Sequence, residues 1–282
     1  MVGYFNNQSS QTAPEKERFF CIFISSLKLQ TMKNKTALIT GATSGIGKAT
    51  AQIFAKNNIR LILCGRRSER LEELQDELSN LTDVTTLKFD VRNKNEVFNA
   101  IESLPKEFQQ IDILINNAGN AHGLSTIQGG DTDDWDAMID INVKGLLYVT
   151  KAILPKMVER NAGFVVNIGS IAGKEVYPNG NVYCASKYAV NALNKGMRMD
   201  LNKHNIRVSA IHPGLVETEF SEVRFKGDTD KAKNVYKGFK ALQAEDIADI
   251  IHFVVTRPYH VNIEDLIVYP TAQASATILN KE

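Results

Sequence analysis

The sequence is poor in cysteine, in net charge and in long apolar runs. Three of its 282 residues are cysteine, Cys21, Cys64 and Cys184, and no two of them are spaced as a CxxC pair. An odd number of separated thiols argues against a disulfide framework or a zinc site, and it predicts reduced thiols in a cytoplasmic protein without bound metal. The net charge of +1 provides no general attraction to nucleic acid or to a membrane.

The lack of a long apolar segment bears most on the beginning of the chain. The apolar run Phe19–Leu27 is too short to span a bilayer. The residues before it carry no net charge and a lysine follows it, which is the wrong arrangement for a signal peptide. We expect residues 1–31 to be a disordered or non-native extension, with Met32 as a possible start, and residues 32–282 to be the folded domain. A peripheral membrane anchor at Phe19–Leu27 is the alternative for this segment.

Short apolar runs alternate with amphipathic helical segments from Lys35 onward. This alternation predicts a parallel sheet covered on both faces, in one doubly wound α/β domain without an internal linker. We expect seven strands, at residues 36–40, 61–64, 85–89, 111–115, 164–168, 207–211 and 265–268. We expect helices at residues 46–57, 69–78, 94–104, 134–160, 182–204 and 244–255.

A glycine-rich turn, TGATSGIG, joins the first strand to the first helix. Gly41 permits a sharp turn, and Gly45 and Gly47 let the backbone approach a pyrophosphate. The N-terminus of the helix then offers free N–H groups to phosphate oxygens. A glycine-rich turn that binds no ligand is the alternative. The residues expected to hold the cofactor phosphates are Gly41, Thr43, Ser44, Gly45, Ile46 and Gly47.

The end of the second strand indicates which nicotinamide cofactor is used. In doubly wound folds an acidic residue at this place binds the ribose 2′-hydroxyl, whereas arginine accommodates a 2′-phosphate. Here Arg66 and Arg67 follow the strand, and no carboxylate lies between the end of the strand and Glu69. Paired guanidinium donors suit a phosphate, so we predict NADP(H) in preference to NAD. The alternative is an ordinary basic start of a helix.

A serine, a tyrosine and a lysine form the candidate catalytic site. Ser170 ends the fifth expected strand, and Tyr183 and Lys187 are spaced i and i+4 on the helix that follows. That spacing places the phenol and the ammonium on one face of the helix. A nearby cation lowers the pKa of a phenol, so Tyr183 is expected to exchange a proton with a substrate oxygen while Ser170 hydrogen-bonds that oxygen.

TGATSGIG, the NNAG segment at residues 116–119, Ser170 and the YCASK segment at residues 183–187 together resemble the short-chain dehydrogenase/reductase family. The resemblance covers Lys33 to about Ala272 and implies a single Rossmann-fold domain and a homotetramer. It also implies that Asn142 is a fourth catalytic residue, which holds a water that connects Lys187 to solvent. Further cofactor contacts implied by the resemblance are Asp90, Val91, Asn117, Ala118, Gly119, Tyr183, Lys187, Pro213, Gly214, Val216 and Thr218.

Three segments resemble one subgroup of that family, the NADP-dependent 3-hydroxy acid dehydrogenases. These segments are FSEVRFKGD at residues 220–228, residues 175–181 and the HVNI segment at residues 260–263. The resemblance implies oxidation of L-allo-threonine and serine and interconversion of 3-hydroxypropionate and malonic semialdehyde. Cys184 departs from the subgroup, which has a small residue there, and we expect little effect.

A substrate of this kind carries a carboxylate and therefore needs a cation. Arg224 and Lys226 are the local candidates, and Arg224 is the predicted substrate ligand beside Ser170; both residues could instead be surface charges. Two other functions are open at this point. One is a carbonyl reductase of uncharged ketones or aldehydes, and the other is a non-catalytic NADP-binding sensor.

Overall fold

A computed structural model describes residues 32–282, which form one seven-stranded sheet in which every strand pairing is parallel. The expected extension at residues 1–31, with its candidate membrane anchor, lies outside the described residues. The strand order is β3-β2-β1-β4-β5-β6-β7, which confirms the doubly wound prediction. The strands are β1 (Thr36–Thr40), β2 (Arg60–Gly65), β3 (Val84–Lys88), β4 (Ile113–Asn116), β5 (Gly163–Ile168), β6 (Ile206–Pro213) and β7 (Asp265–Val268).

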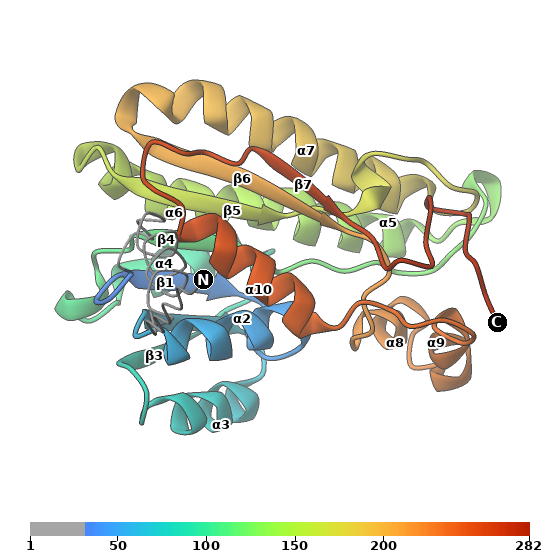
Figure 1. Cartoon of the computed structure of the whole chain (residues 1–282), viewed down its shortest axis with the longest axis horizontal. Coiled ribbons are helices and arrows are strands. Elements are labelled where there is room, and N and C mark those ends of the chain that lie inside the picture. The colour runs from blue at the N-terminus through green and yellow to red at the C-terminus, as the bar shows by residue number, and fades with distance from the viewer. Residues whose placement is uncertain (1–31) are drawn as a thin grey trace, which may run out of the picture.

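Helices cover both faces of the sheet, as Figure 1 shows. One face carries α2 (Gly45–Lys56), α3 (Ser68–Leu78) and α10 (Ala244–Val255). The opposite face carries α4 (Lys94–Glu102), α6 (Leu146–Glu159) and α7 (Asn181–Leu201). Single turns of 3₁₀-helix occur at Lys106–Phe108, Ile127–Gly129, Ile171–Gly173 and Asn202–His204. Within residues 32–282, no helix combines the length and the apolar character needed to cross a membrane.

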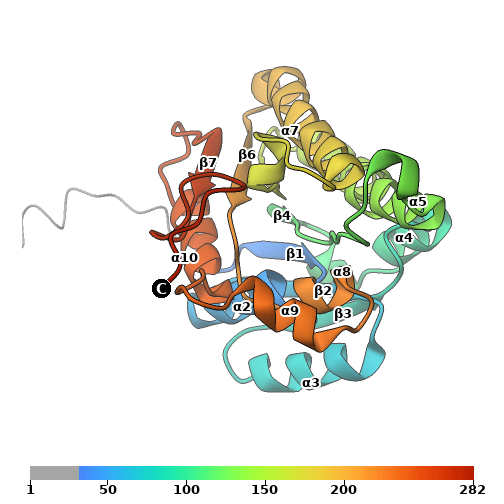
Figure 2. The same ribbon diagram turned by 90° about the vertical axis from the view of Figure 1, so that its right-hand side faces the viewer.

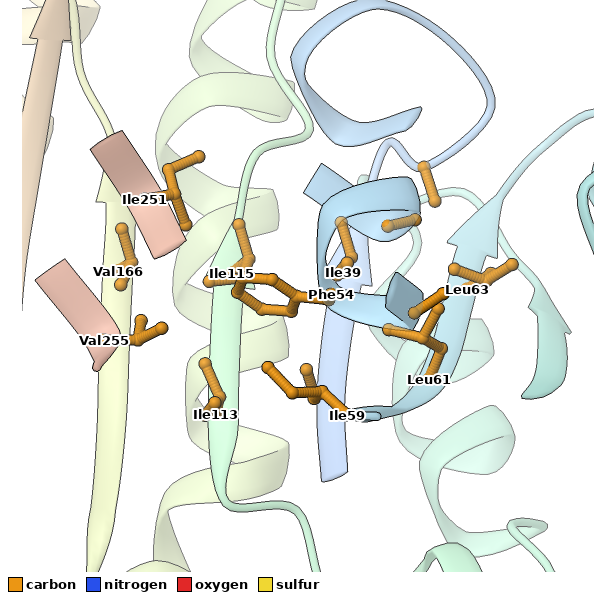
Figure 3. Close-up of a cluster of buried hydrophobic side chains, with 14 of the residues drawn as sticks. Ile39, Phe54, Ile59, Leu61, Leu63, Ile113, Ile115, Val166, Ile251 and Val255 are labelled. Carbon is orange, nitrogen blue, oxygen red and sulfur yellow. The ribbon is translucent and has the colours of Figure 1, made fainter. Parts of the chain in front are cut away.

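The core consists of two main apolar layers, because successive side chains of a strand point to opposite faces. Leu38 and Ile62 belong to the cluster under α4 and α6, whereas Ile39 and Leu63 belong to the cluster under α2 and α10. Figure 3 shows the latter cluster, in which the ring of Phe54 lies among aliphatic side chains of the central strands. These layers fix the strands from which the candidate site residues project.

The strand order reverses between β1 and β4, where the chain returns from the β3 edge to the centre of the sheet. Open α/β sheets bind ligands outside the carboxyl ends of the strands at such a switch point. Two short helices, α8 (Phe220–Arg224) and α9 (Thr229–Val235), lie across this side of the molecule, in front of the sheet in Figure 2. The sequence pattern did not predict either of them.

The sequence pattern predicted one continuous helix at residues 134–160, and this prediction is wrong. The segment 134–160 consists of α5 (Thr132–Ile139), a π-helical segment η3 (Asp140–Gly145) and α6. A π-helical turn widens the backbone to i→i+5 hydrogen bonding and often accompanies a functional site. Buried Asn142 lies in this segment and exchanges two hydrogen bonds with the backbone of Asn120, which holds the wide turn against the loop after β4.

Candidate active site

The glycine-rich loop and the NNAG segment interlock at the ends of β1 and β4. The side-chain amide of Asn117 donates to the carbonyl oxygens of Thr40 (2.9 Å) and Gly41 (3.1 Å). Gly41 has φ +64°, a left-handed conformation that favours glycine. A Cβ on Gly47 would lie 2.3 Å from the Gly41 carbonyl oxygen, so this helix position requires glycine. The loop therefore has a fixed shape, set from both strands.

The N-terminus of α2 faces the same loop with its N–H groups available. Ser44 is the N-cap residue, its side chain makes no capping hydrogen bond, and no acidic residue lies in the first turn. The first N–H groups of a helix lack intrahelical partners, and together with the helix dipole they favour an anion. This end of α2 can accept a pyrophosphate without displacing a protein carboxylate.

Arg66 and Arg67, which are predicted to bind the 2′-phosphate, lie at the end of β2 and already have protein partners. Arg67 donates to the Thr43 hydroxyl from Nε (3.3 Å) and Nη2 (2.9 Å), and from Nη1 to Glu219 (3.0 Å). Arg66 lies 3.8 Å from the carboxylate of Asp90. Burial raises the pKa of Asp90, but hydrogen bonds and charge from Arg92, with the charge of Arg66, outweigh it and hold that pKa below its usual value.

Tyr183 and Lys187 lie on the buried face of α7, as their spacing predicted, with Ser170 at the end of β5. The Lys187 ammonium lies 6.0 Å from the centroid of the Tyr183 ring and donates to the Ile168 carbonyl at 3.0 Å. The Ser170 hydroxyl lies close enough to Tyr183 to lower the pKa of the phenol, and it accepts from the Ala172 N–H at 3.1 Å. The three side chains thus meet at the carboxyl end of β5.

Burial controls the pKa values of this pair. Burial lowers the pKa of Lys187 to about 8. Burial raises the pKa of Tyr183, and the neighbouring Tyr177 raises it further, while the Ser170 hydrogen bond and the charge of Arg224 partly offset the rise. The expectation that Lys187 would lower the pKa of Tyr183 is therefore wrong for this structure, because burial outweighs the nearby charges. Tyr183 is a protonated phenol at neutral pH.

Asn142 lies behind the cavity rather than in its wall. Its side-chain amide donates to the Asn120 carbonyl (2.8 Å) and to the Ser186 hydroxyl (3.0 Å), and its oxygen accepts from the Asn120 N–H (2.9 Å). A Cβ on Gly119 would lie 3.0 Å from the Asn142 oxygen and 3.4 Å from the Lys187 nitrogen. Gly119 therefore lets Asn142 and Lys187 lie close together.

The two candidate substrate cations have different surroundings. Arg224 lines the cavity, donates to the Tyr177 hydroxyl (3.0 Å), and lies 5.5 Å from the centroid of the Tyr183 ring. Lys226 does not line the cavity and pairs with Asp134 (2.9 Å) and Asp131 (3.5 Å). Of the two, Arg224 is the cation that can meet a ligand beside Tyr183.

All these groups border one cavity of about 540 Å³ at the carboxyl ends of the strands. Of the predicted site residues, Gly47 and Asn142 lie behind its wall. The others line it: Gly41, Thr43, Ser44, Gly45, Ile46, Arg66, Arg67, Asp90, Val91, Asn117, Ala118, Gly119, Ser170, Tyr183, Lys187, Pro213, Gly214, Val216, Thr218 and Arg224. A volume of this order suits a cofactor or another small ligand.

Sequence reasoning missed a buried group behind Ser170. The imidazole of His212, on β6, has its Nδ1 3.4 Å from the backbone nitrogen of Ser170 and its Nε2 3.3 Å from Asp265. Burial, followed by the charge of Lys174, lowers the pKa of His212 to about 4, so the ring is neutral at physiological pH. Nothing in the local sequence indicates this contact, because it joins residues far apart in the chain.

The two described cysteines are unpaired, buried thiols. Cys64 lines the cavity, and Cys184 lies on α7 next to Tyr183. Burial raises the pKa of each thiol, so neither is an activated thiolate. Among residues 32–282, no group of three or more histidine, cysteine, aspartate or glutamate side chains is arranged to hold a metal ion.

Comparison with known proteins gives agreement in both sequence and structure. A family model described as short chain dehydrogenase matches residues 35–229. The NADP-dependent 3-hydroxy acid dehydrogenase YdfG of Escherichia coli K12 is 46% identical over 240 residues, which is 85% of this chain and 96% of that protein. The NADP-dependent 3-hydroxy acid dehydrogenase of Schizosaccharomyces pombe is 45% identical over 251 residues, 88% of this chain and 97% of that protein. A solved closed form of serine dehydrogenase in complex with NADP⁺ has a TM-score of 0.83 and 45% identity, and covers 88% of this chain and 99% of its own.

Proposed function

This chain belongs to the short-chain dehydrogenase family, and from that membership we propose that it transfers hydride between NADP(H) and the 3-hydroxyl carbon of a small 3-hydroxy acid. The observation that carries the proposal is the meeting of Ser170, Tyr183 and Arg224 in one cavity. Tyr183 can exchange a proton with a substrate hydroxyl group, and Ser170 can hydrogen-bond to that group. Arg224 can bind a carboxylate. L-allo-threonine, serine and 3-hydroxypropionate have both groups.

The cavity fits a nicotinamide cofactor with a 2′-phosphate. Gly41 lines the cavity with φ +64°, and Gly47 lets the first turn of α2 pack directly against the Gly41 carbonyl. The N-terminus of α2 has no acidic residue in its first turn. Arg66 and Arg67 lie where the adenosine ribose of such folds is held. NADP(H), when bound, supplies the hydride donor or acceptor. Pro213, Gly214, Val216 and Thr218, together with residues 117–119, would enclose its nicotinamide half.

Tyr183 is the proposed general acid and base. Because its pKa is raised by burial, the phenol holds a proton at neutral pH and is ready to donate it to the carbonyl oxygen during reduction. In the oxidative direction Tyr183 must first lose that proton, and its phenolate then receives the hydroxyl proton of the substrate. Ser170, which lies beside Tyr183, would donate to the same substrate oxygen and fix its distance from the phenol.

Lys187 has two proposed roles at this site. Its ammonium, held by the Ile168 carbonyl, would bind the hydroxyls of the nicotinamide ribose. Its pKa of about 8 also lets it take and release protons near physiological pH, so it can replace the proton that Tyr183 loses. Asn142, whose side chain lies beside Gly119 close to the Lys187 ammonium, is the proposed link from Lys187 to solvent.

The assembly and the location belong to the same proposal. We also propose that the protein is a cytoplasmic homotetramer and that residues 32–282 form its folded domain. The family resemblance supports the tetramer, and the two buried free thiols support a reducing compartment.

A substrate panel with both cofactors tests the function. We expect turnover of L-allo-threonine, serine and 3-hydroxypropionate, with kcat/KM for NADP⁺ at least about tenfold above that for NAD⁺, since charged hydrogen bonds to the 2′-phosphate contribute about 1.5–3 kcal/mol each. Steady-state kinetics of the full chain measure this. Preference for simple ketones would favour the carbonyl reductase instead, and NADPH binding without turnover of any substrate would favour the sensor.

Replacing Arg224 by alanine tests recognition of the carboxylate. We expect KM for serine to rise about 30-fold or more, because a charged hydrogen-bonding partner that the bound substrate would cover is lost at a cost of about 2–5 kcal/mol. KM for an uncharged alcohol should change little. Lys226→Gln is the matched comparison, since Lys226 is directed to Asp131 and Asp134; it should leave the ratio of the two KM values unchanged. An equal rise for both substrates in Arg224→Ala would reject carboxylate recognition by this residue.

A further inference from the structure

Glu219 connects the segment over the cavity to the arginines expected to hold the cofactor. It is the residue just before α8, and its two carboxylate oxygens bind different guanidinium groups. One oxygen accepts from Arg67 Nη1 at 3.0 Å, and the other accepts from Arg70 Nη1 at 2.6 Å. These contacts join segments about 150 residues apart in the chain, at the cofactor side of the cavity.

All three guanidinium nitrogens of Arg67 already donate to protein groups, and two of its five N–H groups remain for a further ligand. Its Nε and Nη2 donate to Thr43, and its Nη1 donates to Glu219. A phosphate is bound best by two parallel N–H donors of one guanidinium. An incoming 2′-phosphate that binds Arg67 would therefore share this guanidinium with the neutral Thr43 hydroxyl and the Glu219 carboxylate.

Of these two partners, the Glu219 carboxylate is the one whose charge opposes a phosphate. Burial raises the pKa of Glu219, but hydrogen bonds from Arg70 and Arg67 outweigh it and hold that pKa below its usual value, so the side chain is ionised. Two anions on one guanidinium repel each other, whereas the Thr43 hydroxyl brings no charge. Glu219, Arg67 and Arg70 are each about 40% exposed, so the ion pairs are weak enough to exchange.

We propose that Glu219 is a cofactor-selectivity residue, whose carboxylate lies on the same arginines as the 2′-phosphate of NADP(H) would and repels it. The proposal rests on the proposed use of NADP(H). The carboxylate keeps Arg67 and Arg70 in place in its own ion pairs, and it opposes the 2′-phosphate when the cofactor arrives. Glu219 therefore makes NADP(H) binding weaker than the arginines alone would make it. NAD(H) has a free 2′-hydroxyl and no phosphate, so its binding is not subject to this competition.

The variant Glu219→Gln keeps the size of the side chain and removes its charge. We expect the Kd of NADPH, measured by fluorescence titration of the full chain at low salt, to fall about threefold to tenfold, which is the range set by two exposed ion pairs. The Kd of NADH should stay within about twofold of the wild-type value. The gain for NADPH should shrink as the ionic strength rises, because salt screens exposed charges.

Glu222→Gln is the matched control. Glu222 is an exposed carboxylate on α8, three residues from Glu219, and makes no ion pair with any described residue. It should leave both Kd values unchanged. Unchanged or weaker NADPH binding in Glu219→Gln overturns the proposal, as does an equal gain for NADH or an equal effect of Glu222→Gln. If the wild-type chain binds neither nucleotide, the proposed function fails instead, and that result is distinct from all of these.

Discussion

Replacing Tyr183 by phenylalanine should lower kcat by about 10²- to 10⁴-fold, the usual contribution of a positioned general acid. The change removes the proton donor and keeps the ring, which packs against Phe220 with the ring centroids 5.7 Å apart. The Kd of NADPH should therefore change little, because the cofactor contacts of the loop and of Lys187 remain. Rapid-mixing and steady-state kinetics, together with a NADPH titration, measure the two quantities separately.

The control for this variant is Tyr188→Phe on the same helix. Its hydroxyl donates to the Lys174 carbonyl at 2.6 Å and it lies outside the cavity wall. Loss of that hydroxyl should leave kcat within about twofold of the wild-type value, because the hydroxyl does not line the cavity. The lost hydrogen bond is exposed and neutral, so it contributes about 1 kcal/mol or less to stability. Turnover at the wild-type level in Tyr183→Phe would remove Tyr183 from the proposed acid/base role.

Replacing Gly47 by alanine should weaken NADPH binding about 100-fold or more, since a misplacement of about 1 Å can cost that much. The new Cβ would lie 2.3 Å from the Gly41 carbonyl oxygen and 2.5 Å from the Asn117 amide nitrogen. The first neighbour is backbone and the second is held by hydrogen bonds to Thr40 and Gly41, so the loop itself must open. Overpacking of this kind also costs about 1–3 kcal/mol of stability.

Gly196→Ala is the matched glycine substitution. Gly196 lies within α7, and a Cβ there would have no atom within 4 Å. Alanine should raise the free energy of unfolding by about 0.5–1 kcal/mol and leave the Kd of NADPH unchanged. Equal NADPH affinity in Gly47→Ala and wild type, by calorimetric titration, would mean that the loop does not hold the phosphates.

The strands and most of the site could be predicted because their signals are local. All seven expected strands coincide with observed strands to within two residues at each end. The i and i+4 spacing correctly placed Tyr183 and Lys187 on one face, and the arginine pair was correctly placed at the end of β2. Such features depend on periodicity and on short motifs, which a single sequence displays.

What could not be predicted depends on contacts between distant segments. The π-helical turn at Asn142 is held by the loop after β4, and the partners of Arg67 and Ser170 come from residues 219 and 212. The pKa of Tyr183 was predicted in the wrong direction because burial, which depends on the whole fold, outweighs the Ser170 contact and the charge of Arg224. Short helices such as α8 and α9 have too few turns to give a clear period.

The cavity wall draws residues from the end of every one of the seven strands, from Gly41 after β1 to Gln273 after β7. A ligand in this cavity therefore binds a structure that no part of the sheet can form alone. Binding is then linked to unfolding of the whole described domain rather than to the opening of one loop. By mass action, a ligand present at 100 times its Kd adds about 2.7 kcal/mol to the free energy of unfolding, so nucleotide concentration controls the thermal stability of the entire sheet.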